Sequence, residues 1–139
     1  MRQAVRDFTI NTRGKGLYEF TREVVPWVRD QRFNNGLLTL FCRHTSASLL
    51  IQENADPDVQ TDLARYFDRI APENSRDYVH TLEGPDDMPA HIRSVLTGVQ
   101  LSIPLIGGHL ALGTWQGIYL FEHRSHPHRR SVAAHLLGD

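Results

Sequence analysis

The chain has 139 residues, of which 40% are hydrophobic and 22% charged, with a formal net charge of −1 and a single cysteine. This length supports one domain with a hydrophobic core, and the charge gives no reason to expect a nucleic-acid partner. One thiol excludes an intrachain disulfide and a CxxC site. No apolar run approaches the roughly 18–20 residues of a membrane span, and the first residues lack the apolar stretch of a signal peptide. We therefore expect a single cytoplasmic domain, 1–139, without a membrane partner.

The first half of the chain gives strand and helix signals in turn. A strand is predicted from Gln3 to Thr12, where apolar and polar residues alternate. Apolar residues recur at helical spacing from Leu17 to Val28, which predicts a helix that kinks or restarts at Pro26. The run GLLTLFC from Gly36 to Cys42 indicates a buried strand, and HTSASLLI continues as a second extended segment.

The second half begins with helices and ends with strands. Asp56 can cap a helix that starts at Pro57 and stops at Ala71-Pro72. A short helix is predicted from Pro89 to Leu96. Four strands follow, at residues 99–106, 109–115, 117–124 and 130–137. The predicted class is α+β, a compact single-domain sandwich of largely antiparallel sheet with a few helices.

Residues 78–91, YVHTLEGPDDMPAH, concentrate acids and histidines in a turn-rich segment. His80 and His91 flank Glu83 and Asp87, and neutral imidazoles with a carboxylate suit zinc and similar ions. The alternative is a solvated loop in which Asp86 and Asp87 only complement the dipole of the following helix. The complete set, with His44 available from elsewhere in the chain, favours a site, while Asp86 alone favours the dipole.

Other histidines give weaker signals. His44 stands where a buried strand meets a loop, which suits a ligand or a base, but a strand-end histidine bonded to a nearby hydroxyl is an equal alternative. His123 ends a strand and is ambiguous. The turn HRSHPHRR is expected to be exposed, with His126 and His128 at its tip.

Arginines and one indole complete the candidates. Arg124 and Arg130, beside that turn, have the planar forks that bind phosphate or carboxylate, although a solvated hairpin tip is the commoner use. Trp115 and Gln116 lie between two glycines, where they could stack on and hydrogen-bond to a ring. An indole in a strand is more often part of a core or an interface.

Three stretches, HTSASLLIQENADPDV, YVHTLEGPDDMPAHIRS and GTWQGIYLFEHR, together resemble the YjbQ-like family, in the same order and over essentially the whole chain. That family is commonly described as secondary thiamine-phosphate synthase. The resemblance implies a homotrimer with polar clusters near subunit interfaces and a bound divalent metal ion of the zinc or magnesium/manganese class. On the matching residues it implies His44, His80 and His91 as metal ligands and Glu53, Asp87 and Glu83 as catalytic acids. It leaves Trp115, Gln116, Arg124 and Arg130 for the substrate.

The implied reaction joins a pyrimidine methyl diphosphate to a thiazole phosphate with loss of pyrophosphate. Such chemistry uses a divalent cation and cationic groups on the leaving group. Two alternatives stay open from the residues. One is a metal-dependent hydrolase or lyase acting on a small phosphorylated metabolite. The other is a non-enzymatic trimer that binds a metabolite or a metal.

Overall fold

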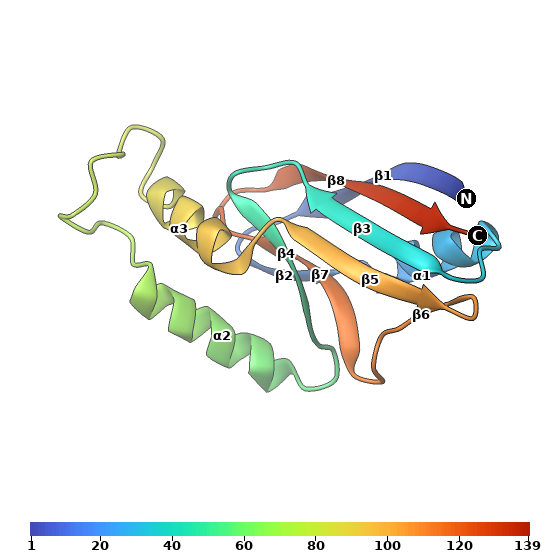
Figure 1. Cartoon of the computed structure of the whole chain (residues 1–139). Coiled ribbons are helices and arrows are strands. Elements are labelled where there is room, and N and C mark those ends of the chain that lie inside the picture. The colour runs from blue at the N-terminus through green and yellow to red at the C-terminus, as the bar shows by residue number, and fades with distance from the viewer.

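The computed structural model describes all residues from 1 to 139 as one α+β domain with two antiparallel sheets. The larger sheet has the order β1-β8-β3-β5-β6, and the smaller has the order β2-β7-β4 (Figure 1). The strands are β1 (Arg2–Thr12), β2 (Gly16–Glu19), β3 (Gly36–Cys42), β4 (Ala47–Glu53), β5 (Gln100–Ile106), β6 (His109–Leu110), β7 (Gln116–Glu122) and β8 (His128–Gly138). The helices are α1 (Thr21–Asp30), α2 (Pro57–Ile70) and α3 (Asp87–Thr97). No helix combines the length and hydrophobicity that crossing a bilayer requires.

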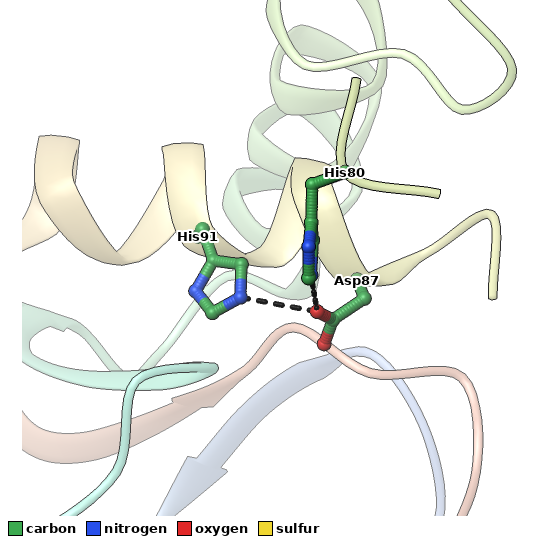
Figure 2. Close-up of side chains that lie close together, drawn as sticks. All are labelled: His80, Asp87 and His91. Carbon is green, nitrogen blue, oxygen red and sulfur yellow. Dashed lines mark hydrogen bonds and ion pairs between the residues drawn. The ribbon is translucent and has the colours of Figure 1, made fainter. Parts of the chain in front are cut away.

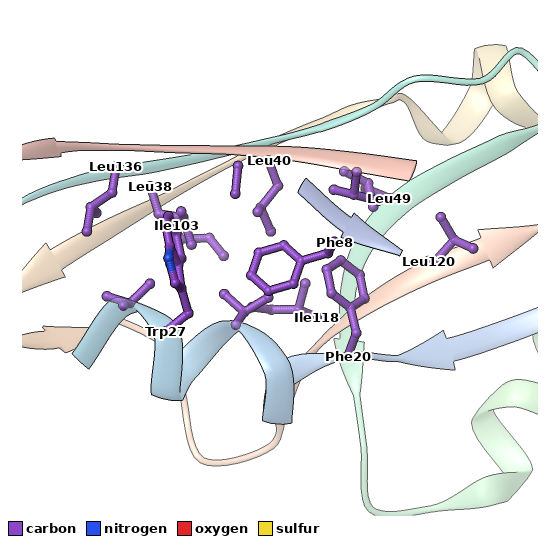
Figure 3. Packing of buried hydrophobic residues seen from close by; sticks show 14 of the residues in the cluster. Phe8, Phe20, Trp27, Leu38, Leu40, Leu49, Ile103, Ile118, Leu120 and Leu136 are labelled. Atoms are coloured by element: carbon purple, nitrogen blue, oxygen red, sulfur yellow. The ribbon is translucent and has the colours of Figure 1, made fainter. Parts of the chain in front are cut away.

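The hydrophobic core lies between the larger sheet, the smaller sheet and α1. Phe8 packs against both Phe20 and Trp27, with ring centroids 6.2 and 5.8 Å apart (Figure 3). Leu38 and Leu136 enter the same core from adjacent strands of the larger sheet. Alternation along these strands turns every second side chain inward, so one face of the larger sheet is apolar and buried.

Two predicted elements have the wrong extent. Leu17 and Phe20 fit a helical period, but residues 16–19 form β2, which pairs with β7, and α1 begins only at Thr21. Cross-strand pairing has overridden a short periodic signal. The predicted strand 109–115 is a strand only at 109–110, and the following residues turn toward β7. Helix α1 continues through Pro26 without a restart.

The remaining predicted elements are confirmed, with small shifts at their ends. Helix α2 begins at Pro57, and the Asp56 side chain accepts a hydrogen bond from the backbone N–H of Asp58. Helix α3 begins at Asp87, two residues before the predicted start. That shift places Asp87 in the first helical turn, and its side chain is buried.

Pairing between β4 and β7 decides which polar residues can meet. Ala47 lies opposite Glu122, and Glu53 lies opposite Gln116. Six residue steps separate the two ends, which is about 20 Å at 3.3 Å per residue. Helix α3 packs on β4, and its N-terminus reaches the end where β7 leads to Arg124.

Candidate functional site

Arg124 connects the N-terminus of α3 to the turn after β7 through hydrogen bonds. Its Nε donates to Asp86 Oδ2 at 2.9 Å, its NH1 to Asp87 Oδ1 at 2.7 Å and its NH2 to the backbone oxygen of Glu83 at 3.0 Å. Burial by itself raises the pKa of the Asp86 carboxyl, but hydrogen bonds from Arg124 and the Ser125 amide lower that pKa overall. Asp86 is therefore more than a dipole partner, because it orients Arg124.

His80, Asp87 and His91 form a compact cluster at this end of α3. Asp87 Oδ2 lies 2.6 Å from Nε2 of His80 and 3.0 Å from Nε2 of His91 (Figure 2). The ligand atoms of the three residues all lie within 4.8 Å of one another. Burial raises the pKa of Asp87, but the His80 hydrogen bond and the charges of Arg124 and His91 give a net lowering. Asp87 is consequently held as a carboxylate.

The two hydrogen-bond contacts of His91 restrict where its protons can lie. Nδ1 of His91 lies 3.1 Å from the backbone oxygen of Thr45. A carbonyl oxygen only accepts, so Nδ1 carries the proton. In the neutral ring, Nε2 is then a bare lone pair that faces a carboxylate oxygen. Such an arrangement requires either a second proton or a metal ion between the two acceptors. An Nδ1–H bonded to a backbone carbonyl is also the usual outer partner of a metal-bound histidine.

The spacing of the cluster fits a small divalent ion after modest opening. Zinc bonds to nitrogen and oxygen are about 2.0–2.2 Å, which places tetrahedral ligand atoms about 3.3 Å apart. The 3.0 Å separation at His91 is close to that value, and the 2.6 Å separation at His80 must widen by several tenths of an ångström. His80 comes from the extended segment before α3, where such a shift is inexpensive.

His44 lies outside this cluster. Its Nε2 accepts a hydrogen bond of 2.8 Å from the backbone N–H of Ser131, so the proton of the neutral ring is on Nδ1. Burial and the nearby charge of Arg130 lower the pKa of His44, which favours the neutral ring. Metal binding through Nδ1 would require loss of that proton. The structure thus groups His80 and His91 with Asp87, and gives His44 the geometry of a hydrogen-bond donor.

A groove of about 770 Å³ adjoins the cluster. It lies between the end of β3, the turn after it and the side of α3 that carries His91, Ser94 and Val95. His44 and His91 both line it. The other lining residues are Phe41, Cys42, Arg43, Thr45, Ser94, Val95, Gly98 and Val99.

His123, whose role the sequence left ambiguous, belongs to a buried hydrogen-bond network. Thr97 Oγ1 donates to the backbone oxygen of Arg93 at 2.7 Å, so at its 2.5 Å contact with Ser48 it must accept. The Ser48 hydroxyl therefore donates its proton to Thr97. It can only accept at its 2.9 Å contact with His123 Nε2, so His123 must donate there. Burial, with the charge of Arg93 and others, lowers the pKa of His123 to about 3. A neutral His123 therefore connects β7 through β4 to α3.

The second predicted arginine is also held internally. Arg130 is buried and bonds both carboxylate oxygens of the buried Glu122, with its NH2 also 3.0 Å from Ser46 Oγ. Burial raises the pKa of Glu122, but hydrogen bonds from Arg130 and Thr12 lower it overall. Both arginine forks thus already have partners within the chain.

The remaining predicted residues lie at the far end of β4 and β7 or on the surface. Trp115 is 62% exposed, and Gln116 accepts a hydrogen bond from the Gly113 amide at 2.7 Å. Glu53 lies opposite Gln116 and accepts at 3.3 Å from the Asp56 amide. Along the strands this end is about 20 Å from the Ala47–Glu122 end, which is the one nearer to the His–Asp cluster. The Glu83 side chain is exposed, and its backbone oxygen receives Arg124.

These features define a class of protein: a single α+β domain of two antiparallel sheets with a His–Asp cluster at a helix N-terminus. The family model described as UPF0047 protein YjbQ-like matches residues 6–139, and the chain belongs to this family. A UPF0047 protein of Synechocystis is 52% identical over 138 residues, covering 99% of this chain and 94% of the relative. UPF0047 protein YjbQ of Escherichia coli O157:H7 is 43% identical, with 96% and 97% covered.

Solved structures agree with the fold. An uncharacterized YjbQ/UPF0047 protein of Clostridium acetobutylicum superposes with a TM-score of 0.87 at 34% identity, covering 95% of this chain and 99% of that one. A conserved hypothetical protein of Thermus thermophilus gives 0.82 at 36% identity, with 95% and 99% covered. The resemblance drawn from the sequence motifs is therefore confirmed at the level of family and fold.

Proposed function

We propose that the protein is a divalent-cation-dependent enzyme acting on a small phosphorylated heterocycle, with thiamine-phosphate synthesis as the named reaction. The observation that carries the proposal is the pair of facing acceptors at Nε2 of His91 and Oδ2 of Asp87. A protein gains little from aligning two lone pairs at 3.0 Å unless a cation or a proton joins them. The YjbQ-like motifs supply the named reaction.

The donor set favours a zinc-class ion. Two imidazoles and one carboxylate suit zinc, manganese, iron or nickel, whereas magnesium prefers oxygen ligands and water. His80, Asp87 and His91 would hold the ion, and Arg124 would keep Asp87 aligned. When bound, the ion would stabilise negative charge on a phosphorylated substrate.

The coupling reaction balances without a redox partner. The thiazole nitrogen forms a bond to the pyrimidine methylene carbon, and the carbon–oxygen bond to the diphosphate breaks. Pyrophosphate leaves with that electron pair.

Glu53, Trp115 and Gln116 lie too far away in the same chain to take part, so a role for them requires a second copy, as the expected homotrimer would provide. We set the reaction in a reducing compartment, since the only thiol, Cys42, is free.

One observation favours the alternative functions. Arg124 and Arg130 are already bonded to Asp86, Asp87 and Glu122, which leaves little cationic surface for a diphosphate leaving group. A metal-dependent hydrolase, or a protein that binds a phosphorylated metabolite without reacting, needs fewer such groups.

Two measurements on the purified full chain test the proposal. Chelator-treated protein is titrated with Zn²⁺ and Mn²⁺ by calorimetry, and the metal-loaded protein is then given both precursors. Stoichiometric metal binding and thiamine phosphate are expected, with both lost in His80→Ala and His91→Ala and retained in the exposed control His126→Ala. Product formed equally by all variants would refute the site. Phosphate release without the thiazole partner would select the hydrolase, and metabolite binding without product would select the binder.

A further inference from the structure

The chain between α2 and α3 brings His80 to the cluster on a segment that packs against little else. We call residues 75–83 of this segment the strap. In Figure 1 the segment loops out beyond the two sheets. Val79 is 97% exposed and Leu82 is 98% exposed, so the apolar side chains of the strap face water. No strap residue belongs to the hydrophobic core or packs against it. Hydrophobic packing therefore does not hold the strap in place.

Hydrogen bonds tie the strap to the rest of the domain at two points only. His80 Nε2 lies 2.6 Å from Asp87 Oδ2, and the backbone oxygen of Glu83, at the end of the strap, accepts from Arg124 at 3.0 Å. Every other hydrogen bond of the strap has its partner between residues 72 and 83. His80 is therefore the only tie between the middle of the strap and the domain.

The backbone turns sharply at both ends of the strap. Asn74, just before it, has a φ of 59°, and Gly84, just after it, has a φ of 101°. Glycine enters this left-handed region freely, and asparagine enters it more readily than most residues. Residues at such turns can absorb large changes in backbone angle, so the strap has a hinge on each side.

The other two members of the cluster are firmly held on α3. Asp87 receives Arg124 NH1 at 2.7 Å, and His91 Nδ1 lies 3.1 Å from the backbone oxygen of Thr45. Figure 2 shows His80 reaching the same carboxylate from a separate segment. The side chain of His80 is 38% exposed, against 3% for Asp87. The cluster thus combines a fixed pair of ligands with a third that arrives on the strap.

One hydrogen bond returns less free energy than ordering the backbone of several residues costs. A bond from His80 to a metal ion shared with Asp87 and His91 is stronger than the hydrogen bond that it replaces. We propose that a divalent ion closes the strap onto the cluster, and that the strap opens frequently when no ion is bound. This closure rests on the proposed function and adds to it a control of access to Asp87 and His91.

Closure sets the number of protein ligands. With the strap open, Asp87 and His91 alone face the ion, whereas with the strap closed His80 completes a set of three. Three protein ligands leave one position for water or substrate in a four-coordinate zinc site. An ion shifts the strap only by the difference between its affinities for the closed and open forms. Metal affinity and closure should therefore depend on the same residue, His80.

Trypsin cleavage after Arg76 measures opening, because proteolysis follows the population of the open form. Arg76 is exposed and forms no ion pair. The purified full chain is freed of metal with a chelator, which is then removed, and digested with and without saturating Mn²⁺. Mass spectrometry quantifies fragments 1–76 and 77–139. We expect the ion to slow this cleavage by roughly tenfold or more. A chromogenic arginine substrate, digested in parallel, shows whether the ion affects trypsin itself.

Two neighbouring variants assign the effect to His80. Without metal, His80→Ala is expected to be cut after Arg76 roughly 2- to 12-fold faster than the unmodified chain, which is the factor that one hydrogen bond contributes. Mn²⁺ should not slow its cleavage. Thr81→Ala is the matched control, because Thr81 is exposed and has no hydrogen-bond partner, and it should behave as the unmodified chain does.

Calorimetry on the same samples separates this proposal from the proposed function. Metal binding to the unmodified chain without slower cleavage would overturn the strap and leave the metal site intact. Absence of metal binding would overturn both. Equal metal-free cleavage of His80→Ala and the unmodified chain would show that His80 does not tie down the strap, and would also contradict the proposal.

Discussion

The two ends of the β4–β7 strand pair carry similar types of residue. They differ in how firmly other elements hold the polar side chains. At the Ala47–Glu122 end, α3 crosses the strands and polar side chains are locked: Asp87 by Arg124, and Ser48 by His123. At the Glu53–Gln116 end the side chains of Glu53 and Gln116 bond only to nearby backbone amides, and Trp115 is 62% exposed. Polar residues on a strand become a preorganised site only where a second element fixes their rotamers. The locked end suits cation binding, and the open end suits contact with another molecule.

The largest expected contrast between the two ends is in stability. Arg130→Ala leaves the carboxylate of Glu122 buried without its charge partner, and should lower the free energy of unfolding by about 3–5 kcal/mol. Trp115→Ala, at the open end, should change it by no more than about 0.5 kcal/mol. Urea unfolding curves measure both. Similar losses in the two variants would mean that the open end is also packed, for example by another copy.

The next largest contrast between the two ends is expected in the metal affinity of variants made at each end. Asp87→Asn removes the charged ligand that faces both histidines and should weaken Zn²⁺ binding more than the roughly 10–100-fold typical of losing an outer partner. The matched carboxylate change at the open end, Glu53→Gln, should leave affinity within about twofold if the ion is held by one chain. Calorimetry of chelator-treated protein gives both constants. A comparable loss in Glu53→Gln would instead show that the site is shared between copies.

Acid should destabilise the locked end. The folded pKa of His123 is about 3, against 6.5 for the unfolded group, so between these values the unfolded chain binds more protons. Stability should therefore fall as pH is lowered through this window, by at most about 1.4 kcal/mol per pH unit. Between roughly pH 6.5 and 4.5 most carboxylates do not yet titrate. His123→Gln should flatten the curve there, and an unchanged slope would contradict the assignment.

Alkali should affect the other half of β7, by a smaller amount. Burial raises the pKa of Tyr119, and the charge of Glu19 adds to the effect. Above the unfolded pKa of 10 the unfolded chain loses a proton that the folded chain keeps, so stability should decline as pH rises. Tyr119→Phe should reduce that decline, whereas His123→Gln should leave it unchanged, as thermal melts between pH 9 and 11 would show.

Much of the fold could be predicted because its signals are local. The Asp56-Pro57 helix start and the apolar run at Leu38 and Leu40 each specify one element without reference to distant residues. The strand at Leu17 could not be predicted in this way, because a four-residue strand is defined by its partner β7, about a hundred positions later. Short apolar spacing fits either period, and tertiary pairing decides between them.

The same distinction applies to the candidate site. His80, Asp87 and His91 fall within twelve positions, and their spacing around one helix start indicated that they meet. The Ser48–His123 contact joins residues 75 positions apart, and only the strand register brings them together. His44 lies just after the end of β3, but its partner is the Ser131 amide and not a neighbouring hydroxyl, and no local pattern reveals that amide.

Strand register has one more effect, at the glycines where β3 and β8 meet. Gly36 lies opposite Gly138, and a Cβ on either would collide with backbone of the other strand, at Leu137 or Asn35. This register therefore needs glycine at both positions, and the same register brings the Ser131 amide to His44. Since successive amides along a strand point to opposite sides, a slip of one residue would turn that donor away. A register that only glycines tolerate at one end of the sheet thus also sets, at the other end, which nitrogen of His44 carries its proton.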